Sequence, residues 1–227
     1  MQRLLNYSHE GIACIVMASG LSTRYGKNKL LEPLGDKPVL LHVTDVALEA
    51  GLKPLVVTRS ADVMRLLENN GIPVVLHDKP LKSDTMHEGL LVLSNETHES
   101  SLADTDASHE RLPLPKQDWD GYLFMQGDQP LVSPESLRRM IDKFRENPDR
   151  AVRLGFGDIV ASPVLFPGCC REALLAYQGD RGGAEVLREG RIPIEVVQAS
   201  AEWELWDVDT PEKIERVREV EQFRGDL

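Results

Sequence analysis

Residues 12–29 read IACIVMASGLSTRYGKNK, and this stretch decides the fold. Its first part, Ile12–Met17, is a nearly continuous apolar run, which is typical of a central parallel strand covered on both faces. The loop that follows contains Gly20 and Gly26, and glycine lets a backbone turn so that its amides point at an anion. The loop also carries three cations: Arg24, Lys27 and Lys29. The stretch therefore predicts a buried strand that leads into a polyphosphate site.

Two familiar phosphate-binding loops do not fit this stretch. A Walker A loop has four residues between its glycines and a Ser or Thr after its Lys. Here five residues separate Gly20 from Gly26, and Asn28 follows Lys27. A dinucleotide fingerprint needs three glycines spaced GxGxxG, which the loop lacks. A plain glycine turn with solvated cations is the structural alternative.

Outward from this stretch, apolar runs alternate with amphipathic segments, which is the pattern of a βαβ series. The 227 residues suffice for one domain with a buried core. We expect a single α/β domain over 1–227, with a mainly parallel central sheet and helices on both faces. The expected strands are 12–17, 54–58, 72–76, 121–126, 161–166 and 194–197. The expected helices are 38–50, 62–69, 84–93, 134–147, a short one near 171, and 211–223.

One segment breaks the alternation. Residues 94–118 are polar, acidic and contain prolines, and they show no apolar periodicity. Loops of this length are usually functional or disordered, and the composition favours a flexible surface insertion. We place that insertion at 94–118 and expect its limits at Ser94 and Trp119.

Composition excludes several classes of protein. With 41% hydrophobic and 28% charged residues the chain is an ordinary globular protein, and no apolar stretch has the roughly 18 residues that cross a bilayer. The first ten residues do not resemble a signal peptide, so we expect a cytoplasmic protein without a membrane partner. The net charge of -11 argues against a nucleic-acid partner. The cysteines fit reduced thiols: Cys14 in the core, and a vicinal pair, Cys169 and Cys170, with a structural role or, alternatively, a soft-metal or thiol site.

A carboxylate marks the end of another predicted strand. GDQP (127–130) directly follows GYLFMQ, which puts Asp128 at the edge of the sheet where open α/β folds bind ligands. A carboxylate there is a suitable ligand for Mg²⁺ that bridges substrate phosphates. The alternative is a turn or helix-capping residue before Pro130. Asp207 and Asp209, in WDVDTP, lie at a similar junction, where a cap before Pro211 is an equally simple explanation.

The glycine loop resembles a nucleotidyltransferase signature, L-A-[AG]-G-x-[SG]-x-R-[MF]-G-x-x-K, although Ser19 and Tyr25 depart from it. The resemblance implies the Rossmann-like fold of nucleotide-diphospho-sugar transferases. It implies that Arg24 and Lys29 grip the triphosphate and, with Asp128, form the catalytic group. The residues implied to surround the base and ribose are Met17, Ala18, Ser19 and Gly20.

Three further segments resemble the MobA-like NTP transferases, and among them the molybdenum cofactor cytidylyltransferases. They are KSDTMHEGL (82–90), SPVLF (162–166) and GDRGGA (179–184). From the first, the resemblance implies that Ser83, Asp84 and Thr85 face the nucleotide. From the third, it implies contacts with the acceptor by Gly179, Asp180, Gly182 and Gly183. In the family a DxDTP segment brings a second carboxylate to the metal, a role that falls to Asp209 first and Asp207 second.

The resemblance implies transfer of CMP from CTP to the phosphate of molybdopterin or its molybdenum-loaded form, with Mg²⁺ as cofactor and pyrophosphate as product. A molybdenum enzyme that receives the cofactor is the implied protein partner. The guanylyltransferase branch has a Cys before its metal aspartate, and this chain has Gly127 there, which favours CTP. The alternatives are a transferase that uses GTP, one that acts on a sugar phosphate, and a non-catalytic carrier of the cofactor.

Overall fold

The computed structural model describes residues 11–20, 28–94, 119–180, 183–190 and 192–225. In this part of the chain, seven strands form one sheet in the order β5-β4-β1-β6-β8-β7-β9. The strands are β1 (Ile12–Ala18), β4 (Pro54–Thr58), β5 (Val74–Leu76), β6 (Gly121–Gln126), β7 (Ala151–Phe156), β8 (Ile159–Pro167) and β9 (Ile194–Gln198). Only β8 runs antiparallel to its two neighbours, β6 and β7. The predicted, mainly parallel sheet is confirmed.

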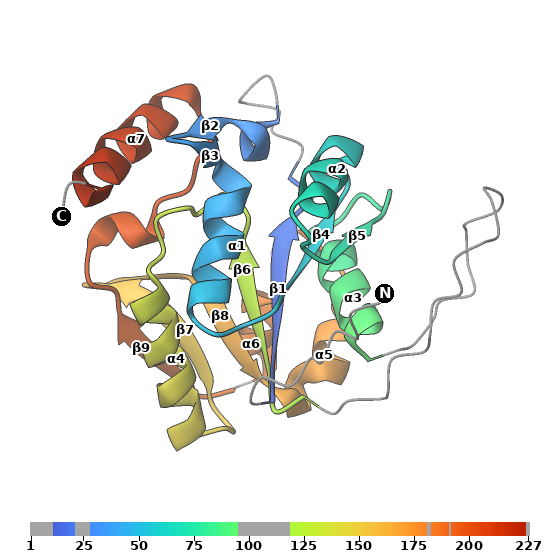
Figure 1. The fold of residues 1–227 in the computed structure, drawn as a ribbon. Coiled ribbons are helices and arrows are strands. Elements are labelled where there is room, and N and C mark those ends of the chain that lie inside the picture. The colour runs from blue at the N-terminus through green and yellow to red at the C-terminus, as the bar shows by residue number, and fades with distance from the viewer. Residues whose placement is uncertain (1–10, 21–27, 95–118, 181–182, 191, 226–227) are drawn as a thin grey trace, which may run out of the picture.

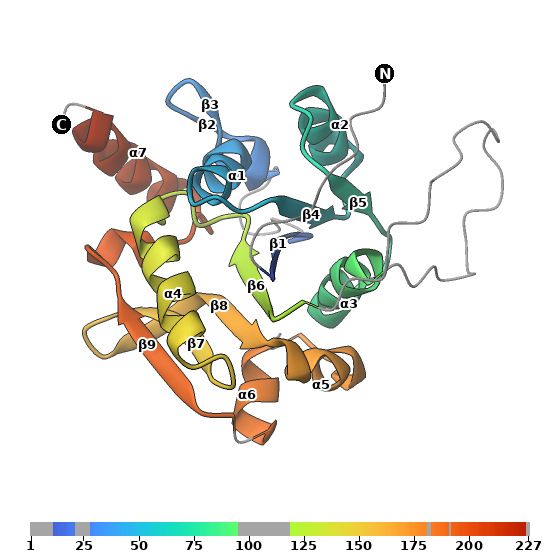
Figure 2. The same cartoon turned by 60° about the horizontal axis from the view of Figure 1, so that its bottom comes forward.

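Helices cover both faces of the sheet, as predicted (Figures 1 and 2). On one face lie α1 (Val39–Glu49), α2 (Ala61–Asn69) and α4 (Pro134–Glu146). On this face α1 packs on β1 and β4, α2 on β4 and β5, and α4 on β7, β8 and β9. On the other face lie α3 (Lys82–Leu93), α5 (Arg171–Ala176) and α6 (Ala184–Gly190). The last helix, α7 (Pro211–Gly225), packs beside the short hairpin of β2 (Pro33–Leu34) and β3 (Lys37–Pro38). Each face thus has its own apolar core.

Most predicted elements occur within two residues of their expected limits, but β7 was not predicted. Its sequence, AVRLGF, contains an arginine and a glycine, so it lacks both a continuous apolar run and a clean alternation. The strand exists because it pairs with β8 on one side and β9 on the other. Pairing with β8, which follows directly in the chain, and with the more distant β9 therefore determines this strand.

The expected limits of the insertion were wrong at both ends, because Ser94 and Trp119 are buried. The indole Nε1 of Trp119 donates to the carbonyl of Leu93 at 3.3 Å, and Arg171 Nε donates to the hydroxyl of Ser94 at 2.9 Å. These contacts attach α3 and the start of β6 to the rest of the fold. The segment 95–118 itself lies outside the described residues.

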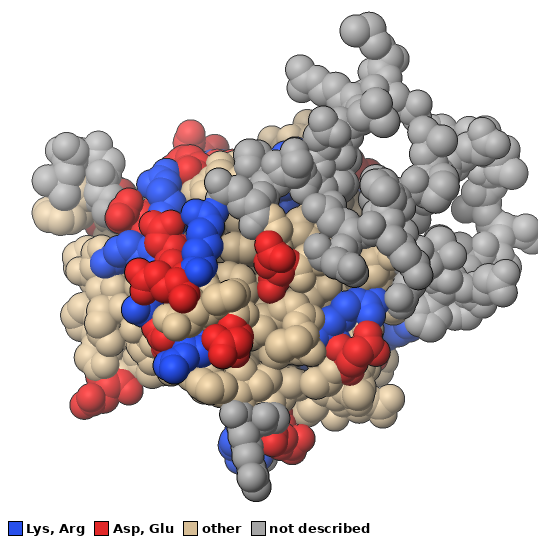
Figure 3. All heavy atoms as spheres, turned by 90° about the horizontal axis from the view of Figure 1, so that it is seen from below, with Lys and Arg blue, Asp and Glu red and all other residues tan. Residues whose placement is uncertain are grey.

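Surface charge is mixed where Figure 3 shows the molecule from below: acidic and basic side chains alternate there instead of forming an extended basic patch. Between α4 and β9, Lys143 forms an ion pair with Glu195 at 3.2 Å. None of the described helices combines the length and the apolar character that spanning a membrane requires.

A buried carboxylate holds the loop that follows β6. Glu204, in the 3-10 helix Glu202–Leu205, is 2% exposed. It accepts hydrogen bonds from the amide and the hydroxyl of Ser133, both at 2.9 Å, and from the amide of Ser200 at 2.8 Å. Ser133 in turn caps α4 by accepting from the amide of Ser136. Glu204 therefore connects the start of α4 to the segment before α7.

We expect Glu204→Ala to lower the free energy of unfolding by about 3 kcal/mol, because it removes hydrogen bonds to a charged acceptor and leaves buried amides without partners. Glu202→Ala, an exposed position in the same 3-10 helix, is the matched control and should change it by less than about 0.5 kcal/mol. Urea denaturation measures both. Equal stability of the two variants would contradict this role of Glu204.

Candidate active site

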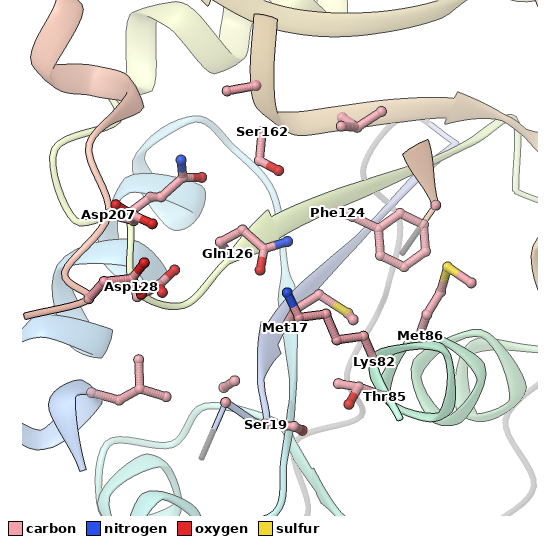
Figure 4. A pocket seen from close by; sticks show the side chains of 18 of the residues that line it. Met17, Ser19, Lys82, Thr85, Met86, Phe124, Gln126, Asp128, Ser162 and Asp207 are labelled. Atoms are coloured by element: carbon pink, nitrogen blue, oxygen red, sulfur yellow. The ribbon is translucent and has the colours of Figure 1, made fainter. Parts of the chain in front are cut away.

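A pocket of about 670 Å³ opens at the carboxyl ends of β1 and β6, on the face that α3 covers. The end of β1 and the loop after it line one side, with Met17, Ala18, Ser19 and Gly20. Figure 4 shows Asp128 and Asp207 together at one end of the pocket, Phe124 and Met86 at the other, and Gln126 between them. The pocket thus has an acidic end and an apolar end.

Three carboxylates meet at the acidic end. Oxygen atoms of Asp128, Asp207 and Asp209 all lie within 4.8 Å of one another. Asp128 comes from the loop after β6, whereas the other two come from the segment before α7, and the amide of Val208 donates to the carbonyl of Asp128 at 2.9 Å. This backbone bond holds the two loops together. The structure therefore brings together the predicted metal ligands.

Lys29 lies between two of these carboxylates. Its Nζ is 2.5 Å from Asp128 Oδ2 and 2.6 Å from Asp209 Oδ1. Lys29 is not one of the solvated cations of the structural alternative: it is 7% exposed in the 3-10 helix Lys29–Leu31. Burial alone would lower the pKa of Lys29, but the carboxylates of Asp128 and Asp209 raise it above its ordinary value. The ammonium group therefore stays charged.

Lys213, on α7, is the second cation of the cluster. It forms an ion pair with Asp207, and its Nζ lies 3.7 Å from Asp209 Oδ2. Burial by itself raises the pKa of Asp209, but the hydrogen bond that Lys29 donates and the positive charges of Lys29 and Lys213 lower it to about 2. Asp209 is therefore ionised at neutral pH, as a metal ligand has to be.

The predicted nucleotide-binding residues divide into two groups. Ser19 and Thr85 line the pocket, and both hydroxyls contact Nε2 of His77, at 3.0 and 3.2 Å. Ser83 and Asp84 do not line it: Ser83 accepts from the amide of Gly179 at 3.2 Å, and Asp84 accepts from the amide of Leu81 at 2.8 Å. These two side chains begin α3 and attach it to its neighbours. Arg24 lies outside the described residues.

The predicted acceptor-binding segment is divided in the same way. Gly183 lines the pocket, and a Cβ there would lie 2.7 Å from Cζ of Phe166, so the close packing requires glycine. Asp180 is exposed and accepts from the amide of Lys82 at 3.2 Å, which places it at the start of α3. Gly179 is hydrogen-bonded to Ser83, and Gly182 lies outside the described residues.

Sequence reasoning missed several side chains of the pocket. Gln126 is the last residue of β6, Ser162 lies on β8, and Arg153 lies on the unpredicted strand β7. His77 was missed because it follows an expected strand without any motif around it. A signal for Arg153 was available in the sequence: it is a charged residue inside an otherwise apolar segment that has the length of a strand.

The cysteine pair does not form a site in this structure. Cys169 is exposed and Cys170 is buried in the 3-10 helix Gly168–Cys170. Burial and the neighbouring Cys169 raise the pKa of the Cys170 thiol to about 12, so it is not a thiolate at neutral pH. This agrees with a structural role.

A profile of the MobA-like NTP transferase domain matches residues 14–194, which include β1 through the start of β9. The chain belongs to the MobA-like NTP transferase family. It is therefore a nucleotidyltransferase domain, as its loop and its order of motifs predicted.

Individual relatives and solved structures are similar to this chain. The purine catabolism protein PucB of Bacillus subtilis is 26% identical over 206 residues, which cover 90% of this chain and 94% of PucB. A probable molybdenum cofactor guanylyltransferase of Thermococcus sibiricus is 28% identical over 134 residues, 59% of this chain and 56% of that protein. Rv0371c of Mycobacterium tuberculosis superposes with a TM-score of 0.71 at 26% identity, over 92% of this chain and 99% of Rv0371c. A second structure of Rv0371c is a complex with manganese.

We expect Lys29→Met to lower the free energy of unfolding of the metal-free protein by about 2 kcal/mol, somewhat less than for a fully buried pair, because Asp128 and Asp209 would lose the ammonium group that lies between them. Added Mg²⁺ should raise the melting temperature of this variant more than that of the wild type, since a divalent ion would neutralise the same carboxylates. Thermal melting with EDTA and with Mg²⁺ measures both effects.

Lys213→Met is the matched control, because the Lys213 side chain is 44% exposed and such pairs contribute little to stability, about 0.5 kcal/mol. If Lys29→Met and the wild type have the same melting temperature in EDTA, the ion pairs of Lys29 do not stabilise the cluster.

Proposed function

We propose that this protein transfers CMP from CTP to the phosphate of molybdopterin or the molybdenum cofactor, with release of pyrophosphate. One observation carries the proposal: the three carboxylates and Lys29 lie in the same pocket as the end of β1 and its loop. A nucleotidyltransferase has to bring a triphosphate and its counter-charges to one place, and this pocket does so with residues from three separate segments.

The donor set fits a hard divalent cation. Asp128, Asp209 and Asp207 offer carboxylate oxygens only, which are the ligands that Mg²⁺ and Mn²⁺ prefer. These three residues would hold Mg²⁺, which supplies positive charge to the phosphate oxygens during transfer. The manganese complex of Rv0371c supports a divalent ion in this family.

The remaining chemistry requires few groups from the protein. The second pKa of a phosphate monoester is about 6, so the attacking oxygen of the acceptor is already ionised at neutral pH and no general base is needed. The chain has to orient the two substrates and compensate the charge of the transferring phosphate. Lys29 supplies a charge that is held in position by two hydrogen bonds.

The choice of base and acceptor rests on resemblance. Gly127 before Asp128, where the guanylyltransferases have cysteine, supports CTP, and the resemblance of GDRGGA supports a cofactor acceptor. GTP is the second candidate, because the Thermococcus sibiricus relative is a probable guanylyltransferase. A molybdenum enzyme that takes up the product is the partner that this proposal implies.

The test of the substrates is a matrix of reactions. The protein is incubated with Mg²⁺, molybdopterin and each of the four nucleoside triphosphates, and released pyrophosphate is measured. We expect release with CTP. Release with GTP alone would change the base, and release only with a sugar phosphate in place of molybdopterin would change the acceptor.

The test of the metal site is Asp128→Asn, which keeps the size of the side chain and removes its charge. We expect normal folding, nucleotide binding without Mg²⁺ close to that of the wild type, and a metal-dependent rate lower by about two orders of magnitude or more. Asp142→Asn, on the exposed side of α4, is the matched control. The measurement is the initial rate at increasing Mg²⁺ concentration for the wild type and both variants. If Asp128→Asn is active with an unchanged Mg²⁺ dependence, Asp128 is not a ligand of the metal ion.

A further inference from the structure

Arg153 lies in an apolar row of the sheet. In the strand pairings Ile15 is opposite Phe124, Phe124 is opposite Val164, and Val164 is opposite Arg153. Directly opposed residues point to the same face of a sheet. Arg153 therefore shares the α3 face with side chains that belong to the apolar core there, and it is the charged member of this row.

The guanidinium of Arg153 is poorly compensated inside the protein. In the part of the chain that the structure describes, it has no carboxylate within ion-pair distance, and its Nε is buried without a hydrogen-bond partner. One contact is present, from a terminal nitrogen to the carbonyl of Val160, at 3.5 Å. Burial lowers the pKa of Arg153, although arginine remains charged at neutral pH. A cation kept in such surroundings is costly unless an anion joins it.

Arg153 also lines the pocket of the active site, together with two further polar side chains that make no hydrogen bond to another described residue. Gln126 on β6 and Ser162 on β8 are these two, and both point into the pocket in Figure 4. The strands β6, β8 and β7 are neighbours in the sheet. Gln126, Ser162 and Arg153 therefore lie on the same wall of the pocket. Such convergent groups in a pocket are typical of a ligand site.

The position of Arg153 separates it from the nucleotide. β7 is three strands away from β1 in the sheet, which corresponds to about 14 Å at the usual strand spacing. The loop after β1 and Lys29 are the groups proposed for the triphosphate, so Arg153 lies on the opposite side of the pocket. Beside it, Phe124 and Phe166 meet edge to face, with ring centroids 5.7 Å apart, and form an apolar wall.

We propose that Arg153 binds an oxyanion of the acceptor molecule, a phosphate or a carboxylate, while the aromatic wall contacts the apolar part of that molecule. The inference rests on the proposed function, since it assigns the β7 side of the pocket to the acceptor. Arg153 is then a binding residue, and Gln126 and Ser162 complete the polar side of the acceptor site.

The experiment uses calorimetry on the whole chain with two probes, phenyl phosphate and benzoate, which combine a flat ring with each kind of oxyanion. Mg²⁺ and the α,β-methylene analogue of CTP or GTP are present at saturation, so that the nucleotide site is occupied. We expect one of the probes to bind the wild type and to bind Arg153→Gln at least tenfold more weakly, with Arg153→Lys intermediate. Arg150→Gln, at an exposed position just before β7, is the matched control and should bind like the wild type.

Stability provides an independent measurement. A structural role would make Arg153→Gln melt below the wild type, whereas an uncompensated binding cation predicts an equal or higher melting temperature. Nucleotide affinity should be unchanged in the variant. If the wild type binds no nucleoside triphosphate, the proposed function fails. If it binds the nucleotide but neither probe binds, or both bind Arg153→Gln as tightly, the assignment of Arg153 fails alone.

Discussion

Parallel pairing of β1 with β6 is the constraint on which the site depends. The two strands are in register from Ile12 opposite Gly121 to Met17 opposite Gln126. The loops that follow them therefore begin side by side at the same edge of the sheet. The amide of Gly127 extends the pairing by donating to the carbonyl of Met17 at 3.0 Å. A Cβ at Gly127 would lie 3.1 Å from Leu40 Cδ1 and 3.2 Å from that carbonyl. Glycine at position 127 lets the backbone pass close to β1 and brings Asp128 beside Lys29.

A second, long-range constraint completes the acidic end. Asp209 reaches Lys29 across 180 positions of sequence, because α7 packs on the β2–β3 hairpin through Leu34, Val208 and Val217. The same packing brings Val208 to the backbone of Asp128. The proposed metal ligands come from distant segments, and an apolar cluster behind them holds these segments in place, so their geometry depends on the last helix.

Local signals in the sequence were sufficient for much of the fold and for part of the site. Asp128 could be predicted because it follows a six-residue apolar strand, and the edge where such strands end is a property of the fold class. The burial of Lys29 could not, since it results from Asp209 at the other end of the chain. Arg153 was missed because β7 has no periodicity of its own. Ser83 and Asp84 were assigned to the nucleotide, although backbone amides use their oxygens: that of Leu81 nearby for Asp84, and that of Gly179, distant in sequence, for Ser83.

The two lysines of the acidic cluster affect how the protein folds before any substrate or metal ion binds. Three carboxylates within 4.8 Å of one another carry like formal charges that repel, but Lys29 and Lys213 reduce the formal charge of these five side chains from -3 to -1. A newly made chain can therefore complete its native structure where free divalent ions are scarce. Binding of the proposed metal ion would then be an exchange of counter-ions at a finished site, in which an ammonium group that is already present gives way to the incoming cation.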